Sequence, residues 1–203
     1  METTYLYDAS LLCLDLVNTR IVQDGAPVDL LTGFDGLVGW LEGAGVLDAD
    51  GARAARSRWG GTAEGEAAFR RALELRDAVL GMADAMIAGQ AVRDADVAAL
   101  NAVLAEAPVA TRVVRREGGF AREAHPAASG PAGLLAPVAD SAVALLTELD
   151  PARVGQCGSP TCILYFYDVT KNRGRRWCSM DRCGSRAKSA AYYRRRHPHD
   201  APE

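Results

Sequence analysis

The sequence predicts a mainly α protein of the α+β class, with a helical N-terminal domain that includes one β-hairpin and a small C-terminal cysteine module. Two observations predict this organisation. The chain is rich in alanine and arginine and poor in aromatic residues, which make up 6% of it, and this composition favours helices. Four of the five cysteines fall in the last quarter of the chain. We therefore expect one domain over residues 1–150 and a second over residues 151–203, with the boundary at Asp150-Pro151.

Helical periodicity continues through most of the first domain. We expect helices over residues 9–21, 34–43, 48–60, 62–89, 94–106 and 131–149. The first of these segments is apolar nearly all round, so it should be buried. Asp48 or Asp50 can cap the third helix and Thr62 the fourth, because a side-chain oxygen can accept from free N–H groups in the first turn. A β-hairpin is expected over residues 111–116 and 120–125, around Gly118-Gly119.

Three polar side chains, Asp15, Asn18 and Arg76, occupy positions where the helical pattern calls for apolar residues. A buried charge is unfavourable unless it is paired, so Asp15 and Arg76 each need a partner. We favour an internal ion pair between Asp15 and Arg76. The alternatives are that Arg76 extends to water or that it meets a small acidic ligand. The three residues are therefore candidates for the polar groups of a ligand-binding pocket or for a buried structural network.

The clustered cysteines form two pairs, Cys157/Cys162 and Cys178/Cys183. Each pair encloses four residues and fifteen residues separate the pairs, so each short loop can supply two sulfurs to a tetrahedral cation. The expected occupant is one structural Zn²⁺, because thiolates favour zinc and four of them leave no position for a substrate. Disulfides, an iron–sulfur cluster and a thiol switch are the alternatives.

The expected compartment bears on these alternatives. No positively charged start followed by an apolar run is visible at Met1, so we expect no secretory signal. A cytoplasmic location follows as the expectation, and there the thiols stay reduced and paired cysteines are more often metal ligands. No apolar run reaches about eighteen residues, so no membrane span is expected.

Local patterns in the module predict a β-hairpin followed by a helix, a treble-clef-like arrangement. Residues 163–168 are aromatic and β-branched, and residues 175–178 can return beside them after a turn. Ser179 can cap a helix that ends before Pro198. Met180, Cys183 and three alanines share one side of this helix, and polar side chains share the other. Zinc would then fasten the apolar side to the hairpin.

The two parts of the chain have opposite charge. Residues 151–203 hold eleven basic and four acidic residues, a formal +7, whereas residues 1–150 have a net charge of −10. Four thiolates and one Zn²⁺ would leave the module at +5. Such asymmetry indicates a nucleic-acid partner, although charged helix faces are often merely solvated. The candidate DNA contacts are Lys171, Asn172, Arg173, Arg175, Arg176, Arg182, Arg186, Lys188, Ser189 and Tyr193.

A short signature surrounds the fourth cysteine of the module, which reads Cys183-Gly184-Ser185-Arg186. Phe166, Asp168, residues 171–173 (KNR) and residues 175–180 (RRWCSM) precede it. These residues resemble the CGNR zinc finger, with Ser185 in place of the usual asparagine. The resemblance implies zinc bound by Cys157, Cys162, Cys178 and Cys183, and a role in DNA binding.

The first domain carries a second set of motifs. Residues 13–19 read CLDLVNT, and Leu30-Leu31, Trp40-Leu41 and residues 45–47 (GVL) follow in order. This set is similar to the ABATE domain, which commonly precedes the CGNR finger in proteins regarded as stress-induced transcription regulators of bacteria. The resemblance implies a sensing or ligand-binding role for residues 1–150.

These features together predict a DNA-binding transcription regulator whose zinc finger is controlled by an N-terminal ligand-sensing domain. The alternative is a zinc–thiolate redox switch or a protein-interaction module without direct DNA binding. An enzyme is not expected, because the sequence has no phosphate-cradling glycine loop, HExxH motif or nucleophile elbow. Since one small finger offers limited surface for recognition, we expect a homodimer on double-stranded DNA, with a small-molecule effector of the first domain.

Overall fold

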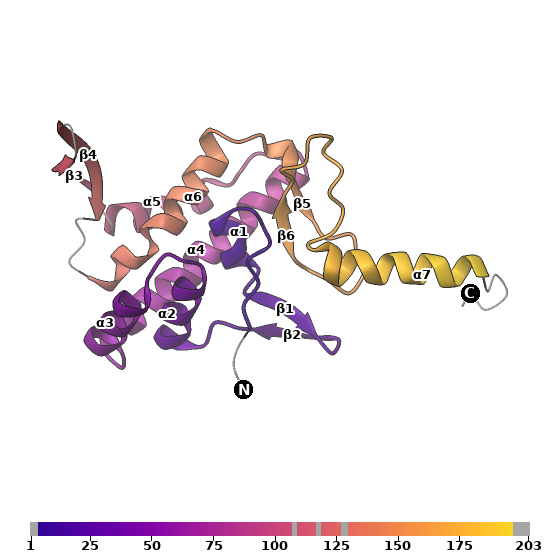
Figure 1. Ribbon diagram of the computed structural model, residues 1–203, viewed down its shortest axis with the longest axis horizontal. Helices are drawn as coiled ribbons and strands as arrows, with labels where there is room; N and C mark the ends of the chain where they lie inside the picture. The colour runs from indigo at the N-terminus through magenta and orange to yellow at the C-terminus, as the bar shows by residue number, and fades with distance from the viewer. Residues whose placement is uncertain (1–3, 107–108, 117–118, 127–129, 197–203) are drawn as a thin grey trace.

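The computed structural model of the protein describes residues 4–106, 109–116, 119–126 and 130–196 (Figure 1). Within these ranges the chain is mainly helical, with small two-stranded antiparallel sheets, as the sequence predicts. None of the helices in this part of the chain is both long and apolar enough to cross a lipid bilayer.

The first helix is shorter than expected. α1 covers only Leu12–Val17, and the chain then forms a hairpin of β1 (Arg20–Gln23) and β2 (Ala26–Asp29). The expected helix over residues 9–21 is therefore wrong at both ends. Ser10 has a φ of 69°, which is incompatible with a right-handed helix. Asp24 and Gly25 have φ values of 51° and 80°, the pair of positive angles that a tight type I′ hairpin turn requires.

The next four helices begin and end close to their predicted positions. They are α2 (Gly33–Gly43), α3 (Ala49–Trp59), α4 (Ala63–Ile87) and α5 (Asp94–Glu106). The Asp48 carboxylate accepts a hydrogen bond from the N–H of Gly51 at 2.7 Å, and the Thr62 hydroxyl accepts one from Gly65 at 3.1 Å. Both predicted caps are thus confirmed, because local side-chain chemistry alone determines them.

The last part of the first domain also follows the prediction. β3 (Val109–Arg116) and β4 (Gly119–Pro126) form the expected hairpin, which extends away from the helices (Figure 1). A 3₁₀ turn, Pro131–Leu135, then leads into α6 (Ala136–Thr147).

The main apolar core joins these helices to the C-terminal module. The long helix α4 lies at the centre and packs against α1, α2 and α5. Trp40 and Leu75 are fully buried in this core, and so are many smaller side chains around them. Val154, Tyr165 and Tyr167 of the module belong to the same cluster. The module therefore packs as part of the protein's main core.

The sheet of the module differs from the prediction. β5 (Val154–Gln156) pairs antiparallel with β6 (Tyr165–Tyr167), so residues 175–178 do not form the second strand. The physical reason is the carboxylate of Asp168, which accepts from the N–H of Thr170 at 2.8 Å and from that of Arg175 at 2.8 Å. These bonds close residues 168–175 into a loop that directs the chain away from β6.

The C-terminal helix begins where the sequence predicts. The Ser179 hydroxyl accepts from the N–H of Asp181 at 3.3 Å and caps a π-helical turn, Met180–Gly184. This turn continues into α7 (Ser185–Arg196), which projects away from the rest of the molecule (Figure 1).

Candidate metal centre and nucleic-acid interface

The four cysteines of the module converge from separate local structures. Cys157 follows β5, and Cys162 lies in the loop between β5 and β6. Cys178 immediately precedes Ser179, and Cys183 lies in the π-helical turn. Cys157, Cys178 and Cys183 are buried and Cys162 is half-buried. The hairpin thus supplies one pair of sulfurs and the helix start supplies the other.

The spacing of the sulfurs fits one tetrahedral cation. All four Sγ atoms lie within 4.8 Å of one another, with 3.7 Å between Cys162 and Cys178 and 3.6 Å between Cys178 and Cys183. Zn–S bonds of about 2.3 Å in a tetrahedron place sulfurs roughly 3.8 Å apart. A disulfide needs about 2.05 Å, and the cysteines are free thiols. An iron–sulfur cluster would hold four cysteine sulfurs further apart than one metal ion does.

The cysteine thiols need a nearby cation in order to ionise together. Hydrogen bonding to Cys162 and burial both raise the pKa of the Cys178 thiol well above its ordinary value. Burial likewise raises the pKa of Cys157. Crowded, buried thiols resist ionisation unless a cation sits among them, and Zn²⁺ supplies that charge. Cys157, Cys162, Cys178 and Cys183 are therefore the ligands of one structural zinc.

Backbone hydrogen bonds hold the two cysteine loops in position. The N–H of Cys157 donates to the carbonyl of Leu164 at 2.8 Å, and that of Gly158 donates to Arg176 at 2.9 Å. A Cβ on Gly184 would lie 2.7 Å from the Met180 Sδ, so a larger residue there would require this flexible, exposed side chain to move. The Ser185 hydroxyl, where the finger usually has asparagine, donates to the carbonyl of Met180 at 2.8 Å. Ser185 therefore also stabilises this turn.

The predicted DNA contacts before the helix fall into two groups. Lys171, Asn172 and Arg176 are exposed on the loop or beside it. Arg173 pairs with Asp150 at 2.6 Å, and Arg175 is only half-exposed. The Arg175 guanidinium donates hydrogen bonds to the carbonyls of Cys178 and Trp177 and to the carbonyl of Asp8 in the N-terminal segment. It also lies 4.6 Å from the ring centroid of Phe166. Arg175 thus holds the loop to its surroundings.

The candidates on the helix differ in a similar way. Arg182 forms an ion pair with Asp8 at 2.5 Å. Arg186 donates from Nη2 to the Sγ of Cys183 at 3.3 Å, so its guanidinium lies beside the zinc thiolates. Lys188, Ser189 and Tyr193 are exposed along α7. Arg182 and Arg186 therefore have structural contacts that a helical wheel cannot show.

The predicted apolar side of this helix is wrong at two positions. Met180 was expected on the side that zinc fastens to the hairpin, yet it is 48% exposed, and Ala190 is exposed as well. Ala187 and Ala191 on the same side are half-buried, so this side of the helix is covered only in part.

The expected Asp15–Arg76 pair does not form. Arg76 is 1% exposed and donates to both carboxylate oxygens of Asp29, at 2.7 and 2.6 Å, and to the Thr19 hydroxyl at 2.8 Å. Asp15 instead accepts from the N–H of Ala9 at 2.9 Å. The prediction missed Asp29 because this residue lies on the unrecognised β1–β2 hairpin, although Asp24-Gly25 is a recognisable hairpin signal.

Asn18 has a third, separate role. Its Nδ2 donates to the carbonyl of Tyr165 at 2.9 Å, and its Oδ1 accepts from the N–H of the same residue at 2.8 Å. Asp15, Asn18 and Arg76 are thus buried, but each has its own protein partner. The structure does not bring the three together.

The fold and the metal centre define a zinc-finger protein in which a helical domain precedes a four-cysteine module. The ABATE family, described as “Putative stress-induced transcription regulator”, matches residues 11–149, and the CGNR zinc finger matches residues 153–196. Because the first match spans more than half of the chain, the protein belongs to the ABATE family. Both resemblances expected from the sequence are thereby confirmed. No curated protein matches the chain.

Proposed function

We propose that this protein is a DNA-binding transcription regulator in which zinc fixes the base of helix α7 and the exposed face of α7 contacts double-stranded DNA. The observation that carries the proposal is the position of this helix, anchored by Cys183 and projecting from the body (Figure 1). A projecting helix can enter the major groove, which is wide enough to admit one. The module also keeps a formal charge of +5 after zinc binding, which favours a polyanionic partner.

The candidate contacts then have different roles. Lys188 and Ser189 on α7 are positioned to reach base edges or phosphates, and Lys171 and Arg176 on the loop are positioned to reach the flanking backbone. Arg175 and Arg182 act as positioning residues, because their guanidinium groups hold the module to the N-terminal segment.

The proposal includes a homodimer, a cytoplasmic location and no catalytic step. Dimerisation would double the small recognition surface and create paired half-sites. Four thiolates leave the zinc without an open position, which argues against metal-dependent catalysis. The first domain would transmit a signal to the finger through the core that the two share.

The alternative is a protein-interaction module or a thiol switch, and the half-buried ligand Cys162 is the observation that favours it. An oxidant reaches an accessible thiolate most readily, so zinc release on mild oxidation would support this alternative.

The deciding experiment measures zinc content together with binding to the gene's own upstream DNA at several salt concentrations. We expect one zinc per chain and an affinity that falls steeply with salt. Lys188→Ala and Lys171→Ala should each weaken binding about 3- to 10-fold and lower the salt slope by about one. Arg53→Ala, on the exposed face of α3, is the matched control and should bind normally. Full zinc content without DNA binding would instead support the protein-interaction module.

A further inference from the structure

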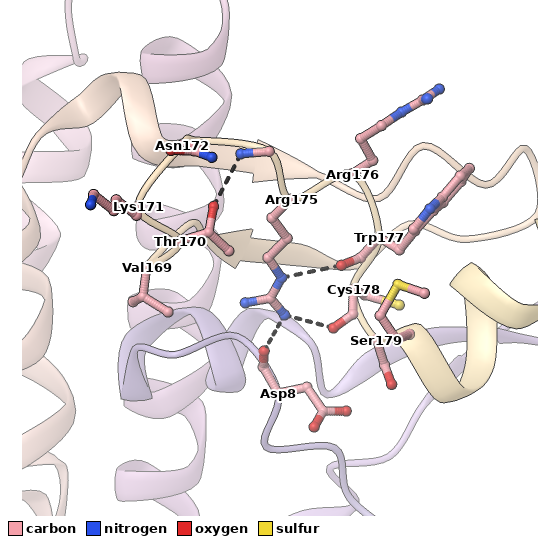
Figure 2. A pocket seen from close by; sticks show the side chains of 12 residues that line it. Asp8, Val169, Thr170, Lys171, Asn172, Arg175, Arg176, Trp177, Cys178 and Ser179 are labelled. Atoms are coloured by element: carbon pink, nitrogen blue, oxygen red, sulfur yellow. Dashed lines mark hydrogen bonds between the residues drawn. The ribbon is translucent and has the colours of Figure 1, made fainter.

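The surface of the zinc module contains a solvent-open cavity of about 710 Å³ (Figure 2). Its walls are the loop at Val169–Asn172 on one side and the segment from Arg176 to Met180 on the other. Asp8, from the N-terminal segment, completes the rim. Ligand sites in proteins typically enclose about 300–1,000 Å³, so the cavity has the size of a small-molecule site.

The walls of this cavity are held by hydrogen bonds. The Thr170 hydroxyl accepts from the N–H of Gly174 at 3.0 Å, and the Asp168 carboxylate closes the same loop. The Arg175 guanidinium forms the floor and donates to the carbonyls of Trp177 and Cys178 at 3.1 and 2.6 Å (Figure 2). The cavity is therefore formed before a ligand arrives, which lowers the free energy needed to order it on binding.

Most of the exposed surface of the lining is apolar. Val169 is 66% exposed and Met180 is 48% exposed, two of the large apolar side chains that the described residues leave open to solvent. The half-buried ring of Trp177 lies on the opposite side of the cavity from Val169 (Figure 2). Exposed apolar side chains that gather around a concavity mark binding sites more often than isolated ones do.

The charge around this lining is positive. The Arg176 guanidinium lies 5.4 Å from the ring centroid of Trp177, and Lys171 is exposed on the opposite wall. Asp8 is the lining carboxylate, and its ion pair with Arg182 at 2.5 Å neutralises it. No hydrogen bond among the described residues engages the Lys171 ammonium group, so it remains able to meet an anion.

We propose that this cavity is an effector site that binds a small organic anion with an apolar body. The apolar body would lie against Val169, Trp177 and Met180, and the anionic group would meet Lys171 or Arg176. This places effector binding on the zinc module, whereas the sequence predicts it in the first domain.

The consequence for DNA rests on the proposed function. Lys171 and Arg176 belong both to the cavity and to the proposed DNA surface. A bound anion would neutralise these cations and occupy their approach to phosphate, so effector and DNA would compete for the module.

The binding test uses the full-length, zinc-loaded protein and the fluorescent anion 8-anilinonaphthalene-1-sulfonate, without DNA. We expect saturable binding of one dye per chain. Val169→Asp removes the apolar wall and Lys171→Glu reverses the charge, so each should weaken binding about tenfold. Ile163→Asp and Arg70→Glu make the same changes at exposed positions outside the cavity and should bind the dye like the unmodified protein. Zinc content and circular dichroism check that each variant folds.

The comparison with an uncharged dye tests the preference for anions. N-phenyl-1-naphthylamine has the same rings without the sulfonate, so we expect it to bind about tenfold more weakly. The proposal is overturned if both cavity variants bind the sulfonate like the unmodified protein, or if the two dyes bind equally. Displacement of the dye by an uncharged nucleoside but not by octanoate would assign the cavity to a nucleobase and also overturn the proposal.

A final measurement separates this site from the proposed function. Saturating sulfonate should reduce DNA affinity of the unmodified protein at least severalfold and leave that of Val169→Asp unchanged. If the protein binds dye at this cavity but never binds DNA, the site stands and the DNA-binding proposal fails. If DNA binds and saturating dye leaves its affinity unchanged, the competition is refuted.

Discussion

The side-chain amide of Asn18 makes two hydrogen bonds to the backbone of Tyr165, donating to its carbonyl at 2.9 Å and accepting from its N–H at 2.8 Å. Both residues are buried, and 147 positions separate them in the chain. The Tyr165 hydroxyl also donates to Asp84 on α4 at 2.6 Å. The strand β6, which adjoins the zinc site, is therefore bonded directly to the helical domain.

Truncating Asn18 should destabilise the whole protein. In Asn18→Ala the N–H and carbonyl of Tyr165 both lose their buried partner, which we expect to lower the free energy of unfolding by about 2–4 kcal/mol. Urea denaturation measures this, with Asn101→Ala on the exposed face of α5 as the control. A loss below about 0.5 kcal/mol, the usual size for a surface substitution, would contradict the joining role of Asn18.

Removing zinc should also affect the first domain. Leu6 and Ile21 of the first domain pack against the cysteine cluster, and Tyr167 lies in the main core. We expect chelation, or Cys178→Ser, to lower the melting temperature of the single unfolding transition by more than about 10 °C. In a Trp177→Phe background, fluorescence of Trp40 and Trp59 on α2 and α3 follows the first domain. An unchanged melting temperature at these tryptophans would show that the domains unfold independently.

Arg186 should contribute to zinc affinity as well as to any DNA contact. Its Nη2 donates to the Cys183 Sγ at 3.3 Å, and a hydrogen bond to a thiolate stabilises the ionised, metal-binding form. Loss of such an outer contact typically weakens metal binding about 10- to 100-fold, so we expect this for Arg186→Ala. Competition with a chromogenic chelator measures it, with Lys188→Ala as the control.

The sequence alone predicts Arg186 differently. A helical wheel assigns it to the outer face and predicts that Arg186→Ala leaves zinc bound. The wheel cannot show that the guanidinium folds back over one turn to the sulfur. Equal zinc affinities for Arg186→Ala and the unmodified protein would support the helical-wheel prediction.

The Arg76–Asp29 pair should respond asymmetrically to removal of either partner. Arg76 is 1% exposed, whereas the Asp29 side chain is 41% exposed and can be hydrated. Asp29→Ala leaves a buried guanidinium without its counter-ion, so we expect a loss of about 3 kcal/mol. Arg76→Met replaces the cation by an apolar chain of similar length and should cost about 1 kcal/mol. Chemical denaturation of both variants measures the two losses of unfolding free energy. If Arg76→Met is the more destabilising, the attraction within the ion pair outweighs the free energy needed to bury the guanidinium.

Local chemistry explains which parts of the fold were predictable. Asp48, Thr62 and Ser179 cap helices through bonds to residues two or three positions away, so the sequence shows both partners. The four cysteines were predictable as ligands because their spacing carries the information. By contrast, the partner of Asn18 is a backbone group 147 positions away, and every residue type has such a group. No local pattern contains such a contact.

Two of the wrong predictions have a shared cause. The apolar run over residues 9–21 resembles a helix, and the hairpin signal at Asp24-Gly25 comes only after it. Since Asp29 lies beyond that turn, the misassigned hairpin also led to the wrong partner for Arg76. The strand pairing of the zinc module failed because Asp168 closes its loop by backbone bonds, which leave no periodic trace in the sequence.

The buried carboxyl of Asp15 should make stability depend on pH. Burial raises the pKa of Asp15 from 3.8 to about 6. The hydrogen bond from the N–H of Ala9 and the positive charge of Arg175 lower this pKa, and the negative charge of Asp8 raises it further. Because the folded protein binds this proton more tightly than the unfolded chain, the contribution to stability is complete below about pH 4 and is lost as pH rises through about 6. Asp15→Asn keeps an acceptor for Ala9 and stays neutral. We expect it to be about 1–2 kcal/mol more stable than the unmodified protein at pH 7.5 and equal to it near pH 4.

Urea denaturation between pH 4 and 8 measures this difference, with the exposed Asp140→Asn as the control for the lost charge. Ala9 links the effect to the finger, since its carbonyl accepts from the N–H of Tyr167 at 2.8 Å. Ionised Asp15 should therefore weaken the packing of the N-terminal segment on β6 as well as overall stability. If the free energies of unfolding of Asp15→Asn and the unmodified protein change in parallel with pH, ionisation of Asp15 does not destabilise the folded protein.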